Sequence, residues 1–508
     1  MSNPIPAATI VLARSRESEE LYLIRRSQHL RFFGGFWAFP GGKVDAADRA
    51  VPWRGRRPDD GLLAIRSATA ARELFEETGV LLARRTDGSF PVAEPAWERV
   101  RLEVADGRRS FGQFLQETNL ALAVEDFTQI GEVTTPEFAP QRYATTFLAG
   151  TLPPGQTPRV CGKELDEGRF VSAADMLVCW NRGACLLSPP TIMTLEAVAG
   201  RPVLEAPLRL GLTMALLKTG KIHPIYFAPC VQMIPLRTMA LPPSTHTNAY
   251  LIGSGPVYLL DPGPSDPSEQ QRLIQVLDEK VERGRKLDGI VLTHHHPDHI
   301  GAVVACAERY RVPVWAHPLT AELVRDKFAV DHLLNDGACL DLGPCPDGGG
   351  PWHMRAMHTP GHAPGHLVFY EPRYRLLFAG DMISTLSSVV IAPPEGDLTQ
   401  YLESLRRMRD LDCRLLLPAH GNASTQSRQT IDDNISLRLA RETQLLDALM
   451  AEPQSLHTID DLARAIYRGL PHNLMKYAKL QLHAGLIKLE REGKVMHVVD
   501  GWRLAEKS

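Results

Sequence analysis

A histidine-rich stretch in the second half of the chain carries residue types that bind transition metals. Residues 293–299 read THHHPDH, which places four candidate ligands within six positions: His294, His296, Asp298 and His299. Imidazole nitrogens and a carboxylate suit zinc, and a tight loop can direct all four side chains into one pocket. A surface histidine tract is the alternative interpretation, but the Asp-His pair and three segments further along the chain favour a metal site.

Those three segments offer more ligands of the same kinds. They are residues 358–366, 376–381 and 415–421, and their candidate ligands are His362, Asp381 and His420. The last two segments are short apolar runs that end in a polar residue, the pattern of a buried strand followed by a loop. Taken singly, such a residue would more often be a cap or a core polar group. Several strands that each deliver a ligand from a C-terminal loop, however, can build one metal pocket.

The apolar pattern predicts the elements that must position these ligands. Residues 290–292 form an apolar run expected to be a strand directly before the histidine stretch. Residues 248–252 and 257–260 predict a hairpin, and residues 270–283 an amphipathic helix. Asp261 follows the hairpin, where it could accept the second N–H of a ligand imidazole. The proline-rich residues 218–247 are expected to be a linker into the first strand.

From roughly Pro235 to Asn422, these motifs in this order resemble the metallo-β-lactamase superfamily, in its glyoxalase II-like and lactamase-B-like branches. The resemblance implies an αβ/βα sandwich with two zinc ions, which lower the pKa of a water molecule and polarise the oxygen of the bond under attack. Carried over residue by residue, it assigns ligands to the two ions: His294, His296 and His362 to one, and Asp298, His299 and His420 to the other, with Asp381 between them. It also implies a catalytic part for Asp298, and it leaves His295, His358 and His366 outside the ligand set.

The first half contains a cluster of acidic residues that could bind a different metal. Glu73, Glu76 and Glu77 stand at i, i+3 and i+4, so a helix ending at Gly79 places them on one face. Carboxylates held this close repel one another unless a cation lies among them, and oxygen ligands favour Mg²⁺ or Mn²⁺ together with substrate phosphates. A solvated acidic helix face is the alternative. Upstream, residues 8–13 and 21–24 predict two strands of a hairpin.

Residues 36–44 and 72–80 together resemble the Nudix box, which implies an α/β/α sandwich and a diphosphate hydrolase that uses Mg²⁺ or Mn²⁺. Gly42 supplies the box glycine, Asp48 stands where the family has Glu, and Glu73 and Glu77 take the catalytic positions beside Glu76. Between Asp48 and Arg72 lie 23 residues where the family pattern has seven, and the proline- and arginine-rich insertion predicts a surface loop. Coenzyme A diphosphatases of the peroxisomal type carry a similarly interrupted box.

A second match points to the coenzyme A branch of that family. Arg26, Arg31, Gly41 and Gly42 follow the spacing of the CoA-recognition signature, although residues 22–24 read YLI where the signature has LLT. The resemblance implies that these four residues bind the ligand, and arginine suits its phosphates through bidentate contacts. Further segments up to residues 187–191 also resemble this branch, so the likeness covers about the first 200 residues.

The C-terminal residues 456–504 predict two helices and a short hairpin, and they resemble the small winged-helix tail of lactamase-B-like proteins. The expected domains are therefore 1–215 (Nudix), 216–440 (metallo-β-lactamase) and 441–508 (winged helix), an α/β and α+β multidomain chain. A winged helix often binds DNA, but without a basic excess we favour packing beside the mouth of the active site.

Composition limits the function classes and the partners. The 508 residues carry a net charge of −3, which gives no general reason to expect nucleic acid or an anionic membrane as partner. The eight cysteines form no CxxC pair, as expected for a reducing cytoplasm. We expect neither a signal peptide nor a membrane span.

The sequence thus predicts a bifunctional hydrolase that acts on a small molecule. The Nudix half is expected to cut the diphosphate of CoA or acyl-CoA, and the second half to hydrolyse a thioester or related ester. Two alternatives stay open, because the shared metal site does not discriminate between substrates. The second half could be a single-strand endoribonuclease, or the Nudix half could be a regulatory module that senses a nucleotide.

Overall fold

The chain folds into two compact units, Met1–Pro229 and Cys230–Ser508, in the computed structural model. The structure describes residues 3–31, 33–55, 58, 61–92, 94–137, 139, 141–162, 164–205, 224–499 and 501–505. The expected domain boundary between residues 215 and 216 lies outside these ranges, as do Arg56 and Arg57 of the expected surface loop. Within the described residues, no helix is both long enough and apolar enough to cross a membrane.

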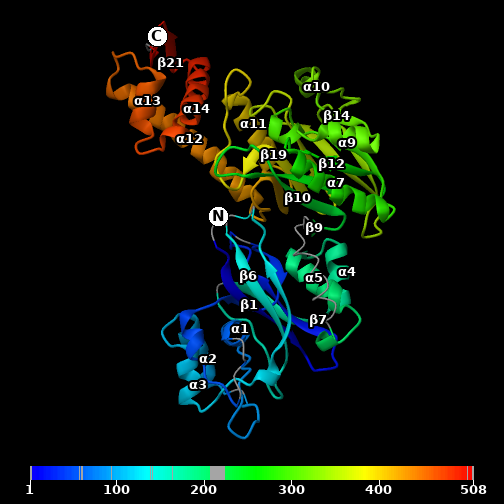
Figure 1. Cartoon of the computed structure of the whole chain (residues 1–508). Coiled ribbons are helices and arrows are strands. Elements are labelled where there is room, and N and C mark those ends of the chain that lie inside the picture. Colours follow the sequence, from blue (N-terminus) through cyan, green and yellow to red (C-terminus); the bar gives the residue numbers. More distant parts are fainter. Residues whose placement is uncertain are drawn as a thin grey trace. The chain divides into compact units, whose positions relative to one another are not determined.

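A mixed sheet forms the centre of the first unit (Figure 1). Its strands are β1 (Ile5–Ala13), β2 (Glu20–Arg26), β3 (Phe36–Ala38), β4 (Gly41–Lys43), β5 (Thr128–Thr134), β6 (Tyr143–Thr151), β7 (Leu165–Ser172) and β8 (Leu186–Leu187). The main path runs β5-β6-β1-β2-β3-β8, with β4 paired to β1 and β7 to β2. β1 lies parallel to β6 and antiparallel to β2, so the predicted hairpin is confirmed.

Helices cover both faces of this sheet. They are α1 (Gly61–Thr78), α2 (Ala96–Ala105), α3 (Phe111–Glu117), α4 (Ala173–Asn181) and α5 (Pro189–Val198), with short 3-10 turns at Ala46–Ala50, Val124–Asp126 and Val203–Glu205. Successive strand residues point to opposite faces. Ile10 and Leu12 accordingly pack with α1, and Val11 and Ala13 pack with α4 and α5. This is the expected α/β/α sandwich.

The long helix α1 corrects one expectation. The spacer before Arg72 was predicted to be a surface loop, yet its last part, Gly61–Ala71, is helical. Ala64, Ala68 and Ala71 are fully buried on the inner face of this added part. Alanine is the best helix former, and its spacing matches the helical period. At the other end, α1 stops at Thr78 and Gly79 follows with φ of +74°, the left-handed conformation that favours glycine.

Two sheets packed face to face form the centre of the second unit. One runs β15-β14-β13-β12-β11-β10 within the unit, and the other runs β16-β17-β18-β19-β20. The first set of strands is β10 (Val231–Arg237), β11 (His246–Ile252), β12 (Val257–Leu260), β13 (Leu287–Val291), β14 (Val314–Ala316) and β15 (His332–Leu333). The second set is β16 (Cys339–Pro344), β17 (Pro351–His358), β18 (Leu367–Glu371), β19 (Leu376–Ser384) and β20 (Leu415–His420).

Polar and aromatic contacts join the inner faces of the two sheets. The Tyr250 hydroxyl and the Asn248 side-chain amide both donate to the Pro418 carbonyl, at 2.8 and 3.0 Å. The rings of Tyr250 and Phe378 meet edge to face at 5.1 Å. The outer layers are helices: α7 (Pro267–Glu282), α8 (Pro297–Ile300), α9 (Val303–Tyr310), α10 (Pro318–Val324), α11 (Leu398–Arg409) and α12 (Ser427–Ala451). The expected αβ/βα sandwich is therefore present.

The segment expected to be a linker contains strands. β9 (Ile225–Ala228) ends the first unit and β10 begins the second, while residues 218–223 lie outside the described part. Six of the seven residues of β10 are buried, and the strand pairs antiparallel with β11. Proline is uncommon inside a strand, so the sequence VQMIPLR does not by itself indicate one.

The predicted C-terminal helices and hairpin are also present. They are α13 (Ile459–Ile466), α14 (His472–Arg491), β21 (Val495–Val498) and β22 (Gly501–Leu504). Leu445 and Leu449 of α12 pack into their core with Leu482 and Trp502. The expected boundary between residues 440 and 441 falls inside α12, so one continuous helix joins the sandwich to the tail.

Candidate functional site

Loops at the ends of strands of the second unit bring the predicted metal ligands together. The histidine stretch follows β13, and Pro297 at the first position of α8 stops the loop and starts the helix. His362 lies in the loop between β17 and β18, Asp381 lies in β19, and His420 is the last residue of β20. These elements belong to both sheets, so the pocket forms where the two sheets meet.

Three imidazoles form the first group. The Nδ1 atom of His296 lies 2.9 Å from Nε2 of His294 and 2.9 Å from Nε2 of His362. His294 is fully buried, and His362 is 8% exposed. Three ring nitrogens that converge on one point from two loops are a donor set for a transition metal.

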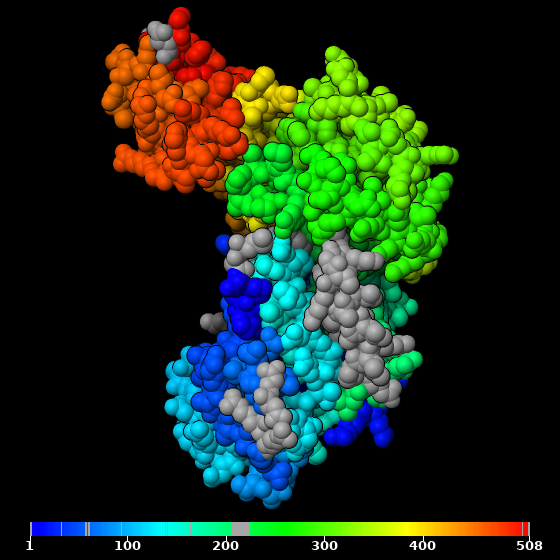
Figure 2. Space-filling model, in the orientation of Figure 1, coloured from blue at the N-terminus to red at the C-terminus, as the bar shows by residue number. Residues whose placement is uncertain are grey.

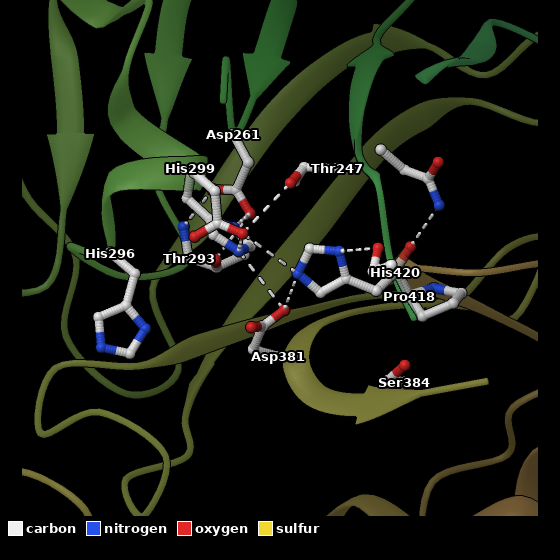
Figure 3. A network of polar contacts seen from close by, with 12 residues as sticks. Thr247, Asp261, Thr293, His296, His299, Asp381, Ser384, Pro418 and His420 are labelled. Carbon is white, nitrogen blue, oxygen red and sulfur yellow. Dashed lines mark hydrogen bonds and ion pairs between the residues drawn. The ribbon is translucent and has the colours of Figure 1, made fainter. Parts of the chain in front are cut away.

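The second group combines imidazoles with carboxylates (Figure 3). His299 and His420 meet Asp298, whose Oδ2 atom lies 3.9 and 3.4 Å from their respective Nε2 atoms. Asp381 lies against both groups: Oδ1 is 3.2 Å from Nε2 of His420 and 3.4 Å from Nε2 of His299, and Oδ2 is 3.6 Å from Nε2 of His362. All seven predicted ligands are therefore neighbours, with Asp381 shared.

Two unsatisfied polar atoms indicate that a cation fits this pocket. Among the described residues, Nε2 of His299 and Oδ1 of Asp381 are buried and make no hydrogen bond of acceptable geometry. Buried polar atoms without partners are costly, so native proteins rarely keep them. A divalent ion held between an imidazole nitrogen and a carboxylate oxygen would satisfy both atoms, and the surrounding ligand chemistry suits such an ion.

The other ring nitrogen of each buried imidazole is occupied, which fixes the nitrogen that faces the pocket. Nδ1 of His362 lies 2.8 Å from the Val390 carbonyl oxygen, and Nδ1 of His420 lies 2.9 Å from the His246 carbonyl oxygen. Nδ1 of His299 lies 2.9 Å from Oδ2 of Asp261, which confirms the predicted role of that carboxylate. Such contacts orient ligand imidazoles and select their tautomer.

Burial and neighbouring carboxylates shift the pKa values of the imidazoles in opposite directions. Burial lowers the pKa of His296 to about 3 and that of His294 well below its ordinary value, so both rings stay neutral, as ligands must. Burial also opposes charge on His420, but Asp381 and Asp298 outweigh it and raise the pKa of His420 to about 10. The carboxylates thus favour positive charge beside them, which a bound cation can supply.

Of the three histidines left out of the ligand set, two make structural contacts. His366 is fully buried, and its Nε2 accepts from the backbone N–H of Asp381 at 3.1 Å. His358 stacks on His317 with ring centroids 4.0 Å apart. Both therefore support the loops around the pocket.

His295 has a partner that sequence reasoning missed. Its Nε2 atom lies 3.0 Å from Oε2 of Glu395, and together with His296 these residues form a further group of close metal-type donors at the edge of the site. Glu395 follows two prolines in the long connection between β19 and α11, one hundred positions from His295. A lone exposed glutamate in a loop gives no sequence signal for such a contact.

In the first unit the predicted acidic cluster is present but is organised by an arginine. Arg72 donates to Oδ1 of Asp48 at 2.8 Å, to Glu73 at 2.9 Å and to Glu76 at 3.0 Å. Asp48 is almost fully buried and also accepts from the Thr69 hydroxyl, so the inserted spacer does not separate it from the box helix. Within the described residues, the carboxylates of this cluster do not converge on a common point as the second unit's ligands do.

The two strongest candidates in this cluster are the partly buried carboxylates of Glu73 and Glu77. Burial raises the pKa of Glu73 to about 7, although Arg72 opposes the shift. Burial also raises the pKa of Glu77 well above its ordinary value, while the backbone N–H of Gly41 donates to Glu77 at 3.0 Å. Two carboxylates partly shielded from water beside one arginine lack enough positive charge around them, and a divalent cation, which prefers oxygen ligands, fits there.

The predicted ligand-binding residues of the first unit lie around this cluster. Gly41 and Gly42 lie in β4, next to the box helix, and a Cβ atom on Gly42 would come within 2.3 Å of the Glu73 carboxylate. Arg26, at the end of β2, is close enough to act on the charge of Glu77. Arg31 is exposed.

Comparisons with known proteins agree with this division. Residues 4–104 match the NUDIX domain, residues 243–420 the metallo-beta-lactamase superfamily, and residues 458–502 the beta-lactamase associated winged helix domain. The "Beta-lactamase-like protein 2 homolog" of Drosophila melanogaster is 28% identical over 49% of this chain and 84% of its own length. The "Atrochrysone carboxyl ACP thioesterase" of Aspergillus chevalieri is 28% identical over 50% of this chain and 79% of its own length.

A bacterial relative is similar over a shorter stretch. The "Hydroxyacylglutathione hydrolase" of Bdellovibrio bacteriovorus is 33% identical over 30% of this chain and 55% of its own length. The domain matches, their order and the two candidate sites together lead to one conclusion: the chain is a hydrolase that joins a Nudix domain, a metallo-β-lactamase superfamily domain and a β-lactamase-associated winged-helix domain, in this order.

Proposed function

We propose that the second unit hydrolyses a thioester or a related ester at a site that holds two zinc ions. The observation that carries the proposal is the convergence of seven donors in two groups that share Asp381. Relatives named as a thioesterase and as a hydroxyacylglutathione hydrolase support the substrate class. The ligand sets are those expected from the sequence: His294, His296 and His362 for one ion, and Asp298, His299 and His420 for the other.

The chain's own residues hold and orient this site. When bound, two such ions lower the pKa of a water molecule and polarise the carbonyl oxygen of the substrate. The contacts of Asp261, the Val390 carbonyl and the His246 carbonyl keep the ligand rings in place before substrate arrives. Asp298 would hold the attacking water, and its Oδ2 atom lies 3.4 Å from both the Thr247 hydroxyl and Nε2 of His420, which orient the carboxylate. A thiolate leaving group needs little further assistance.

For the first unit we propose hydrolysis of the diphosphate of CoA or acyl-CoA with Mg²⁺ or Mn²⁺. Glu73, Glu76 and Glu77 would hold the metal, and Arg26 and Arg31 would contact phosphates. The raised pKa values of the partly buried carboxylates on α1 and the contact of Gly41 with Glu77 support this assignment. The two proposals share a substrate, because acyl-CoA contains both a thioester and a diphosphate.

The decisive experiment compares one variant in each unit. Acyl-CoA is added in the presence of Mg²⁺ and Zn²⁺. Free thiol is followed with a chromogenic thiol reagent, and diphosphate cleavage is followed by mass spectrometry as 3′,5′-ADP. We expect thiol release to disappear in His296→Ala and to persist in Glu77→Gln, with the opposite result for 3′,5′-ADP. His353→Ala, an exposed histidine of β17, is the matched control.

Three outcomes distinguish the alternatives. Wild-type protein that releases no thiol from acyl-CoA but cuts single-stranded RNA, in a manner sensitive to His296→Ala, would assign the second unit to the ribonucleases. Thiol release that is unaffected by His296→Ala would show that this site does not hydrolyse the thioester. A first unit that binds nucleotides without forming 3′,5′-ADP would support a sensing role.

A further inference from the structure

A buried arginine of the C-terminal half contacts the connection between β19 and α11, which borders the candidate metal centre. Arg438, in α12, is 6% exposed, although arginine is rarely buried without a carboxylate partner. In the described parts of the chain it makes no ion pair. Instead, Nη2 donates to the Val389 carbonyl oxygen at 2.5 Å, and Nη1 donates to the side-chain oxygen of Gln481 at 2.9 Å. Both acceptors are uncharged oxygens, so its positive charge is not paired with a negative one.

The Val389 carbonyl has a second donor from the winged-helix tail. The side-chain amide of Gln481, in α14, donates to the same oxygen at 2.6 Å. Figure 2 shows the yellow segment around this loop directly against the orange and red tail. Two helices that lie far apart in the sequence thus hold one peptide group of the connection between β19 and α11.

The next residue in that connection orients a candidate metal ligand. The Val390 carbonyl oxygen accepts from Nδ1–H of His362 at 2.8 Å, which leaves Nε2 of His362 facing the metal pocket. Val389 and Val390 share one peptide plane, so the position of the Val389 carbonyl determines where the Val390 backbone can lie. Arg438 and Gln481 therefore restrain the orientation of His362 through two peptide groups.

A second route leads from the same arginine to the shared carboxylate. The guanidinium of Arg438 lies 5.3 Å from the ring centroid of Tyr401, which is fully buried. The Tyr401 hydroxyl donates to the Met382 carbonyl oxygen at 2.8 Å, one residue from Asp381. Tyr401 also packs against Gly361, because a Cβ atom on that glycine would lie 2.3 Å from the Tyr401 backbone. The first route thus ends at His362 and the second next to Asp381, two candidate ligands that lie against each other.

Simple attachment of the tail would not require this arrangement. A buried charge costs free energy, and a well-packed apolar residue of similar size usually stabilises an interface as well or better. A charged group held by several oriented hydrogen bonds instead restricts geometry. The arrangement is thus better suited to positioning the loop than to attaching the tail.

We propose that Arg438 and Gln481 are positioning residues for the metal centre, through which the winged-helix tail keeps His362 in its metal-binding orientation. This inference rests on one part of the proposed function, namely that the seven donors bind metal. It assigns the tail a role in the site itself, without any contact between the tail and the substrate.

The test measures metal binding separately from catalysis. In Arg438→Met, which keeps the aliphatic stem and removes the donors, one of two Zn²⁺ ions should bind about tenfold more weakly in chelator competition, as for other residues that orient metal ligands. The visible absorption spectrum of the Co²⁺-substituted protein should change, because it reports ligand geometry. Arg438→Lys, which keeps the charge and one donor, should recover part of both signals.

A control and a second variant keep the result interpretable. Arg441→Met removes an arginine one turn further along α12 that lies over Tyr467 in the tail, and it should leave both metal signals unchanged. If Arg438→Met does not fold by circular dichroism, Gln481→Leu decides, with the same expected shifts. Variants that fold, lose thermal stability and yet keep wild-type Zn²⁺ affinity and Co²⁺ spectrum would overturn the proposal. Wild-type protein that binds no transition metal would instead refute the proposed function.

Discussion

At the scale of single residues, the candidate metal centre depends on the contacts of both ring nitrogens of each histidine and of both carboxylate oxygens of Asp381. His362, His299 and His420 each direct one nitrogen to the pocket and give the other to an oxygen of the protein. Asp381 is different, because its two oxygens lie against imidazoles of both groups. Loss of its charge should therefore affect both ions, whereas loss of a single imidazole should affect one.

Asp381→Asn tests this point. Freshly purified wild-type protein should contain about two zinc or similar ions per chain, the number that such a site holds. The variant should lose most of them and keep its circular dichroism spectrum. Elemental analysis gives the metal content, and Asp412→Asn, an exposed residue paired with Arg375, is the control. A variant with undiminished metal, or wild type without transition metal, would contradict the assignment.

At the scale of elements, the first unit depends on a close fit between a helix and a short strand. α1 presents Glu73 to β4, where Gly42 leaves room for the carboxylate. Arg72, on the same helix, donates hydrogen bonds to Asp48 and to two of the glutamates. One helix therefore carries the glutamates and an arginine whose positive charge partly balances theirs. A side chain on β4 should therefore disturb the acidic cluster without unfolding the sheet.

Gly42→Ala should reduce the release of 3′,5′-ADP by at least about tenfold, because the added Cβ atom would come within 2.3 Å of Glu73 and displace its carboxylate. Thiol release by the second unit should not change. Gly61→Ala, at the start of the same helix with nothing within 4 Å of the new atom, should keep full activity and raise stability by about 0.5 kcal/mol. Equal activity of the two variants would show that the Glu73 position is not required.

At the scale of the whole molecule, the chain consists of two compact units that each contain their own core and their own candidate site. Ligands stabilise only the part of a protein that binds them, by an amount set by concentration and affinity. Removal of zinc should therefore act on one unit and leave the other unchanged.

Calorimetry tests this independence. A zinc-selective chelator should lower the midpoint of one unfolding transition and leave a second transition in place. Leu74→Ala removes a fully buried side chain of the first unit and should lower the unfolding free energy of that unit by about 2–5 kcal/mol. The midpoint of the second transition should therefore fall, while the chelator-sensitive transition should stay unchanged. A single transition that responds to both changes would mean that the units unfold together.

Local patterns were sufficient to predict much of this protein. The four donors within residues 294–299 and the apolar runs before Asp381 and His420 predicted which side chains come together and the strands that carry them. Glu73, Glu76 and Glu77 predicted a helix that ends before Gly79, and the hairpin of β1 and β2 followed from two apolar runs with polar residues between them. These features depend on neighbours close in the sequence, so the sequence alone determines them.

Features that depend on distant segments were decided by the tertiary structure. The pairing of His295 with Glu395, the contact of His362 with the Val390 carbonyl, and the clamp of Arg438 and Gln481 on Val389 all join residues far apart in the chain. β10 was missed because its proline opposes a strand locally, while pairing with β11 stabilises one. Residue types and spacing specify which atoms can bind a metal, but only the packing of the sheets and helices brings those atoms together and orients them.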